Sequence, residues 1–299
     1  MTCRRRWHAQ WRRHRGLTVA LNQTHPVAAG GWALATVGVI LALGGCGGGG
    51  NAGPATFNVS APSGAYVRQS AQYTSYPGSV SSAWSVTLPD VLAGSTIYVV
   101  GIWPNYVSNY PTMAVTDNGS NAYRLLDRYD DVTVKMLGIQ GAESMGHWYA
   151  ANVGAGSYTI NMSPTPQTFE DWVGVVAFEV AGVSSTPLGA HILNAQTSIP
   201  PGANAVSATV TTNIPSGILI AVTFDDINVS LPTEPLAGSG FARIAHPLWN
   251  FARAPLPLGA SAAAEYLILT SAGTHTATFS AQEGGSEFPD YLTCAVVFH

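Results

Sequence analysis

The chain contains an internal repeat, because three segments recur in the same order at a nearly constant distance. The matched pairs are LPDVLAGSTIYVVGI (88–102) with VTTNIPSGILIAVTF (210–224), HWYAANVGAGSYTINMS (147–163) with AEYLILTSAGTHTATFS (264–280), and GVVAFE (174–179) with CAVVFH (294–299). Aligning Gly94 with Gly217 gives an offset of 123 residues, and aligning Tyr149 with Tyr266 gives 117. The fold must therefore be built from two related units.

Apolar residues in these segments alternate with a period of two, which is the period of a β-strand. STIYVVGIW (95–103), SYTINMS (157–163) and ILIAVTF (218–224) are rich in β-branched and aromatic residues, and turn-forming residues separate them. No segment has a convincing amphipathic helical pattern. We predict an all-β fold of two antiparallel β-sandwich units of jelly-roll or immunoglobulin-like type, spanning 56–185 and 186–299. The alternative is that both halves fuse into one large sandwich.

Two details of the repeat predict local structure. Gly156 and Gly273 end matched Ala-Gly turns, so we expect them at positive φ, which other residues adopt only with strain. The segments VVAF (175–178) and AVVF (295–298) are apolar at every position, which predicts central strands covered on both faces. Cys294, just before the second segment, is expected to be a buried small hydrophobe.

The first 45 residues have the layout of an export signal, with six arginines before an uncharged apolar run at 27–45. Leu43-Gly44-Gly45-Cys46 resembles the lipobox of bacterial lipoproteins, in which small residues precede a cysteine that becomes acylated. The resemblance implies that residues 1–45 are a signal peptide and that a lipid on Cys46 holds the protein at the membrane of the bacterial cell envelope. By resemblance to the sorting rule of Gram-negative lipoproteins, Gly47 after this cysteine, rather than aspartate, implies the outer membrane, with the body facing the periplasm or the exterior. A retained membrane anchor and a cleaved secreted protein are the alternatives.

Composition differs sharply between the leader and the remaining chain. Residues 46–55 are glycine-rich and are expected to form a flexible tether. The leader holds six of the 12 Lys and Arg residues and none of the 16 Asp and Glu residues, which leaves a formal charge of −10 on the rest. An acidic body disfavours nucleic acid as a partner, because such binding depends on neutralising phosphates.

The body also resembles a known group of modules. LAGSTIYVVGI, VTDNGSNAYRLL, HWYAANVGAGSYTINMS and VVAFEVAGV are similar to motifs of a broad, largely uncharacterised group of β-sandwich modules in bacterial secreted proteins and phage structural proteins. The resemblance covers about residues 80–299. It implies extracellular display, adhesion or glycan binding, and these motifs mark turns and strands rather than chemistry.

Two aromatic segments are the best candidates for a ligand site. WPNYVSNYP (103–111) and HPLWNFARAP (246–255) lie where the two units are most irregular. Flat rings beside amide and guanidinium donors suit sugars or peptides, although the same rings could cap the sandwich ends. The predicted ligand-binding residues are Trp103, Tyr106, Tyr110, Trp249, Phe251 and Arg253.

Weaker signals concern calcium and catalysis. Asp117, Asn118 and Asn121 offer oxygen ligands to Ca²⁺, but the DNG sequence is first a turn signal, and we otherwise expect no cofactor. The segment AESMG (142–146), followed by His147, superficially resembles a nucleophile elbow, which requires a helix that this chain does not offer.

Acidic pairs allow a glycosidase only under one condition. Glu170 with Asp171, or Glu179 with Glu265, would need carboxyl groups about 5–9 Å apart. The sequence thus favours a lipid-anchored binding or adhesion module for a glycan or protein, without catalysis. A structural or assembly lipoprotein and a hydrolase on a β-sandwich are the alternatives, and the sequence carries no signal of oligomeric state.

Overall fold

The computed structural model describes residues 55–56, 64–74, 80–81, 83–104, 112–130, 135–136, 139–140, 143–165, 169–170, 173–196, 206–227, 237–244, 249–253, 258–279 and 290–299. Every regular element in these ranges is a β-strand, so the predicted all-β class is confirmed. Correspondingly, the described part of the chain holds no helix long and apolar enough to cross a membrane.

The strands before and after residue 185 belong to different sheets, and these two parts of the chain are here called the first and the second half. The first half contributes β1 (Ala55–Thr56), β2 (Tyr66–Thr74), β3 (Val80–Ser81), β4 (Trp84–Val91), β5 (Thr96–Pro104), β6 (Thr112–Asp117), β7 (Arg124–Asp130), β8 (Lys135–Met136), β9 (Ile139–Gln140), β10 (Glu143–Ala150), β11 (Gly156–Thr165), β12 (Phe169–Glu170) and β13 (Gly174–Ala181). The second half contributes β14 (Leu188–Gln196), β15 (Val206–Thr212), β16 (Gly217–Ile227), β17 (Ala242–Arg243), β18 (Trp249–Arg253), β19 (Leu258–Leu269), β20 (Gly273–Phe279) and β21 (Asp290–Phe298).

Five strands of each large sheet follow corresponding orders, with β2-β13-β5-β10-β7 in the first half and β14-β21-β16-β19-β17 in the second. The first large sheet runs β1-β2-β13-β5-β10-β7, and the second runs β14-β21-β16-β19-β17, with β18 also paired to β19. A smaller sheet, β4-β11-β6, belongs to the first half, and its counterpart β15-β20 belongs to the second. Strands that carry the matched sequence segments therefore occupy corresponding places, and all the pairings are antiparallel.

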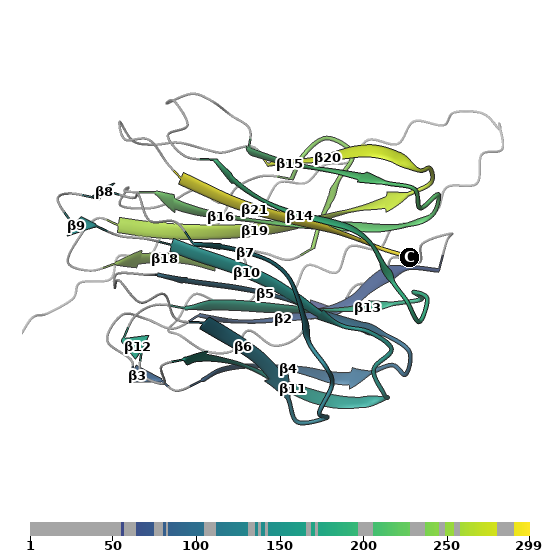
Figure 1. Cartoon of the computed structure of the whole chain (residues 1–299), viewed down its shortest axis with the longest axis horizontal. Coiled ribbons are helices and arrows are strands. Elements are labelled where there is room, and N and C mark those ends of the chain that lie inside the picture. The colour runs from purple at the N-terminus through teal and green to yellow at the C-terminus, as the bar shows by residue number, and fades with distance from the viewer. Residues whose placement is uncertain are drawn as a thin grey trace, which may run out of the picture. The chain divides into compact units, whose positions relative to one another are not determined.

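Three apolar clusters fill the spaces between these sheets, which Figure 1 shows as successive layers. The first cluster, here called the shared core, combines side chains of both large sheets, including Tyr98 and Phe178 from the first half and Ile220 and Phe298 from the second. A second cluster lies between the first large sheet and β4-β11-β6, and a third lies between the second large sheet and β15-β20. Each large sheet is therefore covered on both faces.

The apolar runs of the central strands follow from this layering. Along β5, Ile97 and Val99 point to the second cluster while Tyr98 and Val100 point to the shared core. Strand β13 lies between β2 and β5 and is buried at every position, and β21 lies between β14 and β16. The predicted central placement of both closing strands is confirmed.

The two matched turn glycines also adopt the expected geometry. Gly156 has φ of +157° and Gly273 has φ of +143°, each at the start of its strand, β11 and β20. An added Cβ would meet no atom within 4 Å at either position, so it is the backbone conformation that favours glycine there.

Candidate metal centre

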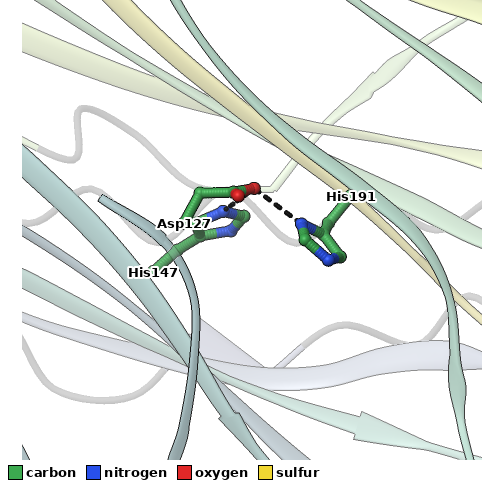
Figure 2. A group of neighbouring side chains, drawn as sticks. All are labelled: Asp127, His147 and His191. Carbon is green, nitrogen blue, oxygen red and sulfur yellow. Dashed lines mark hydrogen bonds and ion pairs between the residues drawn. The ribbon is translucent and has the colours of Figure 1, made fainter. Parts of the chain in front are cut away.

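Three side chains from three strands converge at one point of the described structure: Asp127 on β7, His147 on β10 and His191 on β14 (Figure 2). Each offers one metal-ligating atom, and these atoms all lie within 4.8 Å of one another. Two of the residues belong to the first half of the repeat and one to the second.

Sheet register brings Asp127 and His147 together. The two residues are direct partners in the antiparallel pairing of β7 with β10, so their side chains lie on the same face. Immediately beyond this pair the register shifts, with Trp148 opposite Leu125, so Leu126 is an extra residue of the bulge. Such a bulge re-aims neighbouring side chains and is frequent beside functional sites.

His191 reaches the pair from the second large sheet. Strand β14 forms the edge of that sheet and pairs with β21, where His191 stands opposite Val296. Leu193 and Ala195, which follow on alternate positions, pack against the shared core, so His191 points toward the first half. The cluster thus lies at the seam between the two large sheets.

The carboxylate of Asp127 joins both imidazoles. Its Oδ2 lies 3.1 Å from Nε2 of His147 and 2.6 Å from Nδ1 of His191, and as a carboxylate oxygen it accepts from both rings. The His147 side chain is fully buried, whereas those of Asp127 and His191 are 33% and 30% exposed. One side of the cluster therefore faces solvent.

The pKa values of Asp127 and His147 are shifted in directions that favour the metal-binding protonation states of both groups. The hydrogen bond from His147, supplemented by that from His191, lowers the pKa of Asp127 to about 2, which outweighs the opposing effect of partial desolvation. Burial lowers the pKa of His147 below its ordinary value, although Asp127 opposes this. At neutral pH the cluster therefore holds a carboxylate and a neutral buried imidazole, which are the forms that coordinate metals.

The donor set discriminates between metal ions. Two imidazole nitrogens and one carboxylate oxygen suit Zn²⁺ and other divalent transition metals, whereas Ca²⁺ and Mg²⁺ prefer six or more oxygen ligands. A tetrahedral ion about 2.0–2.1 Å from each donor would hold the donors roughly 3.3 Å apart. The donor atoms, which lie within 4.8 Å of one another, would reach that spacing if side-chain shifts brought the most distant pair closer by up to about 1.5 Å.

Behind His147, a hydrogen-bonded chain runs into the shared core. The hydroxyl of Tyr98 on β5 lies 3.0 Å from Nδ1 of His147 and 3.4 Å from Sγ of Cys294 on β21. Burial raises the pKa of Tyr98 well above its ordinary value and that of the Cys294 thiol to about 12, so both remain protonated. Cys294 is a fully buried free cysteine, as the sequence predicted.

One predicted ligand-binding residue needs correction. Trp103 is fully buried on β5, where its ring centroid lies 6.3 Å from that of Trp148 and 5.5 Å from the guanidinium carbon of Arg128. A ring without solvent access cannot stack on a sugar, so the prediction of an exposed binding residue is wrong at this position.

The other predicted binding residues have no described side chains. Tyr106, Tyr110 and the lipidation site Cys46 lie outside the described residues. Trp249, Phe251 and Arg253 form part of β18, which pairs with β19, but their side chains are not among those described. Glycan or protein binding through these residues stays a prediction.

The DNG segment forms a turn whose oxygens serve the protein itself. Oδ1 of Asp117 accepts from the backbone amides of Gly119 and Asn121, and its Oδ2 accepts from Asn121 Nδ2 and from the Tyr123 hydroxyl. Asn118 Oδ1 accepts from the amide of Thr159. Both carboxylate oxygens of Asp117 and Oδ1 of Asn118 thus accept hydrogen bonds within the protein, which supports the predicted turn.

Among the described residues, those considered for catalysis are not paired in the way that catalysis would require. Ser144 donates to Asp130 and, three positions from His147 on the same strand, points to the opposite face, so these two residues form no nucleophile–base pair. Glu179 accepts a hydrogen bond from the amide of Leu92, just after β4, whereas Glu265 accepts one from the amide of Thr278 on β20. Strands β4 and β20 belong to different sheets, so the two carboxyl groups lie in separate layers of the fold. They form no glycosidase pair, and Asp171 lies outside the described residues.

Comparisons with known proteins do not indicate a family or a function for this chain. No protein-family model, no curated protein and no solved structure matches this chain. The geometry of the cluster is accordingly the evidence on which a function must rest.

Sequence reasoning missed Asp127 and His191 altogether and considered His147 only as part of the supposed elbow. One signal was available for His147, since it occupies an inward-facing position in the alternation of SMGHWYA (144–150), beside the buried residue Met145. A histidine at a core position of a strand needs a polar partner, which indicates a functional or structural network.

Proposed function

We propose that this chain is a lipid-anchored protein of the bacterial cell envelope whose β-sandwich body binds a divalent transition metal ion of the Zn²⁺ class. Asp127, His147 and His191 would supply the three protein ligands. The observation that carries the proposal is their convergence within 4.8 Å, from three strands and both halves of the repeat.

The exposure of the cluster supports a binding role. Zinc sites with three protein ligands keep a fourth position for water or another ligand, whereas structural sites are usually closed by four. Because Asp127 and His191 are each about one third exposed, that fourth position would face solvent. An envelope protein with such a centre could hold a partner through a ligand atom donated to the metal.

The proposed envelope location rests on the leader. The six arginines, the apolar run and the Leu43-Gly44-Gly45-Cys46 sequence support export, lipidation of Cys46 and membrane attachment. An exported protein meets its metal outside the cytoplasm, where a solvent-facing centre of this kind would have access to it.

Zinc is expected to stabilise the full chain, purified without a histidine tag and treated with chelator. At a free Zn²⁺ concentration about 100-fold above the dissociation constant, binding to the folded state adds about 2.7 kcal/mol. For a protein of this size that corresponds to a melting temperature increase of roughly 5–10 °C. Differential scanning fluorimetry gives the increase, and isothermal titration calorimetry should give one ion per chain.

The matched control replaces one histidine at a time. His191→Ala is expected to remove the thermal shift, whereas His275→Ala should retain it, because His275 lies on β20 and bonds to the carbonyl of Ser271. Equal zinc responses of wild type and His191→Ala, or no response of the wild type, would reject the metal centre.

A further inference from the structure

Tyr98 is held in a fixed position by three aromatic contacts. Its ring stacks on Phe178 with centroids 5.8 Å apart and an interplanar angle of 22°, and it meets Phe298 edge-on at 5.6 Å. The ring of His147 is also edge-on to it, at 5.9 Å. The hydroxyl therefore cannot swing away from the two atoms beside it, Nδ1 of His147 and Sγ of Cys294.

A phenol hydroxyl between two such neighbours has two complete hydrogen-bonding states, because it donates one hydrogen and also accepts. In the first, Tyr98 donates to Nδ1 of His147 and the thiol of Cys294 donates to Tyr98. In the second, Nδ1 of His147 donates to Tyr98 and Tyr98 donates to the sulfur. Both states leave all three buried atoms with a partner.

The partner of Nε2 decides which state is adopted. Beside Asp127, at 3.1 Å, Nε2 of the neutral ring must carry the proton, since a carboxylate only accepts. Nδ1 is then an acceptor, as in the first state. A metal ion on Nε2 would require a lone pair there, so the Nε2 proton would leave to solvent as the ion binds. To stay neutral the ring would take up one solvent proton on Nδ1, as in the second state.

We propose that Tyr98, with Cys294 behind it, is a positioning residue for the metal centre, whose hydroxyl oxygen accepts a hydrogen bond from Nδ1–H of His147 when Nε2 binds metal. This inference rests on the proposed metal-binding function and names the residues that tune it. Metal-bound histidines usually donate their second nitrogen to a fixed acceptor, which orients the ring and selects the tautomer. Here that acceptor comes from the first half of the chain, and its own acceptor, Cys294, comes from the second.

The test compares zinc dissociation constants of the full chain, measured by competition with a chromophoric chelator. Tyr98→Phe removes the acceptor while keeping the ring and is expected to weaken zinc binding about 10–100-fold. Cys294→Ala should weaken binding less, and Cys294→Ser should bind nearly as wild type because a hydroxyl restores both roles. The matched control is Tyr149→Phe, the same substitution in a ring that also packs against Phe298, and it should bind as wild type.

A second readout follows the tautomer directly. NMR spectra of the protein with ¹⁵N-labelled histidine are expected to show the His147 proton on Nε2 without zinc and on Nδ1 with zinc. In Tyr98→Phe, a smaller fraction of His147 should change tautomer when zinc is added. Two results would overturn the positioning role of Tyr98 while leaving the metal centre in place. These are wild-type zinc affinity in Tyr98→Phe, and a wild-type His147 tautomer that does not change on zinc binding.

Failure of the wild type to bind zinc would instead reject the proposed function. If Tyr98→Phe does not fold, the zinc dissociation constants of Cys294→Ala and Cys294→Ser are compared instead. Equal constants would overturn the positioning role of Tyr98 and Cys294.

Discussion

Replacing Glu179 by alanine is expected to lower the free energy of unfolding by about 3–5 kcal/mol. The fully buried carboxylate accepts hydrogen bonds from Arg68 Nη1 at 2.7 Å, Gln69 Nε2 at 2.6 Å, Ser95 Oγ at 2.9 Å and the amide of Leu92 at 2.8 Å. Its loss leaves buried donors without their acceptor, and each such group costs about 1–3 kcal/mol. Arg68 is 30% exposed, so solvent screening makes its share the smaller one.

Urea denaturation of the full chain, followed by tryptophan fluorescence, measures this change. The control is Glu179→Gln, which keeps the shape and one acceptor oxygen and should cost less than the alanine variant. A decrease below about 1 kcal/mol in Glu179→Ala would show that water or local rearrangement satisfies the donors. It would contradict the role of this carboxylate in joining β13 to β2 and to the turn between β4 and β5.

The layered fold could largely be predicted from the local pattern of apolar residues. A strand covered on both faces must be apolar at successive positions, and this is why VVAF (175–178) and AVVF (295–298) could be placed centrally from sequence. In STIYVVGIW (95–103), Trp103 is separated from Ile97 and Val99 by even numbers of residues, so its side chain lies on the same buried face of the strand. The prediction that Trp103 binds a ligand relied on the aromatic composition of the segment and did not apply this alternation.

The candidate metal centre could not be predicted in the same way, because no local pattern contains it. Asp127 meets His147 through the register of two strands with a bulge beside them, and His191 meets both only because the two large sheets pack against each other. Sequence separations of 20 and 64 residues from Asp127 match no compact metal motif. Packing between repeated halves creates positions that neither half defines alone.

Two buried carboxylates, Glu179 and Glu265, differ in the groups that surround each of them within its own half of the chain. Glu179 on β13 is surrounded by side-chain and backbone donors, including a guanidinium. Glu265 on β19 is equally buried but accepts from two backbone amides, those of Gly238 and Thr278. Burial raises the pKa of Glu265 from its ordinary value of 4.5 to about 7, with the two amide hydrogen bonds opposing the rise. The folded state therefore holds a proton at this site more tightly than the unfolded state.

The expected consequence is a loss of stability as pH increases between about 4.5 and 7. Below this window Glu265 is protonated in both states, and above it the group is ionised in both, so the free energy of unfolding falls only in between. A pKa difference of this size corresponds to roughly 3 kcal/mol, at about 1.4 kcal/mol for each unit. Glu265→Gln stays neutral throughout and should remove this decrease.

Urea denaturation of wild type and Glu265→Gln at several pH values from 4 to 8 isolates this contribution. All the other titrating groups are common to both proteins, so the difference between their unfolding free energies reports Glu265, apart from a constant offset for the altered hydrogen bonds. The variant is expected to gain roughly 3 kcal/mol relative to wild type between pH 4 and pH 8. A difference that does not change with pH would mean that Glu265 titrates normally in the folded protein, and hence that water or a cation reaches it between β19 and β20.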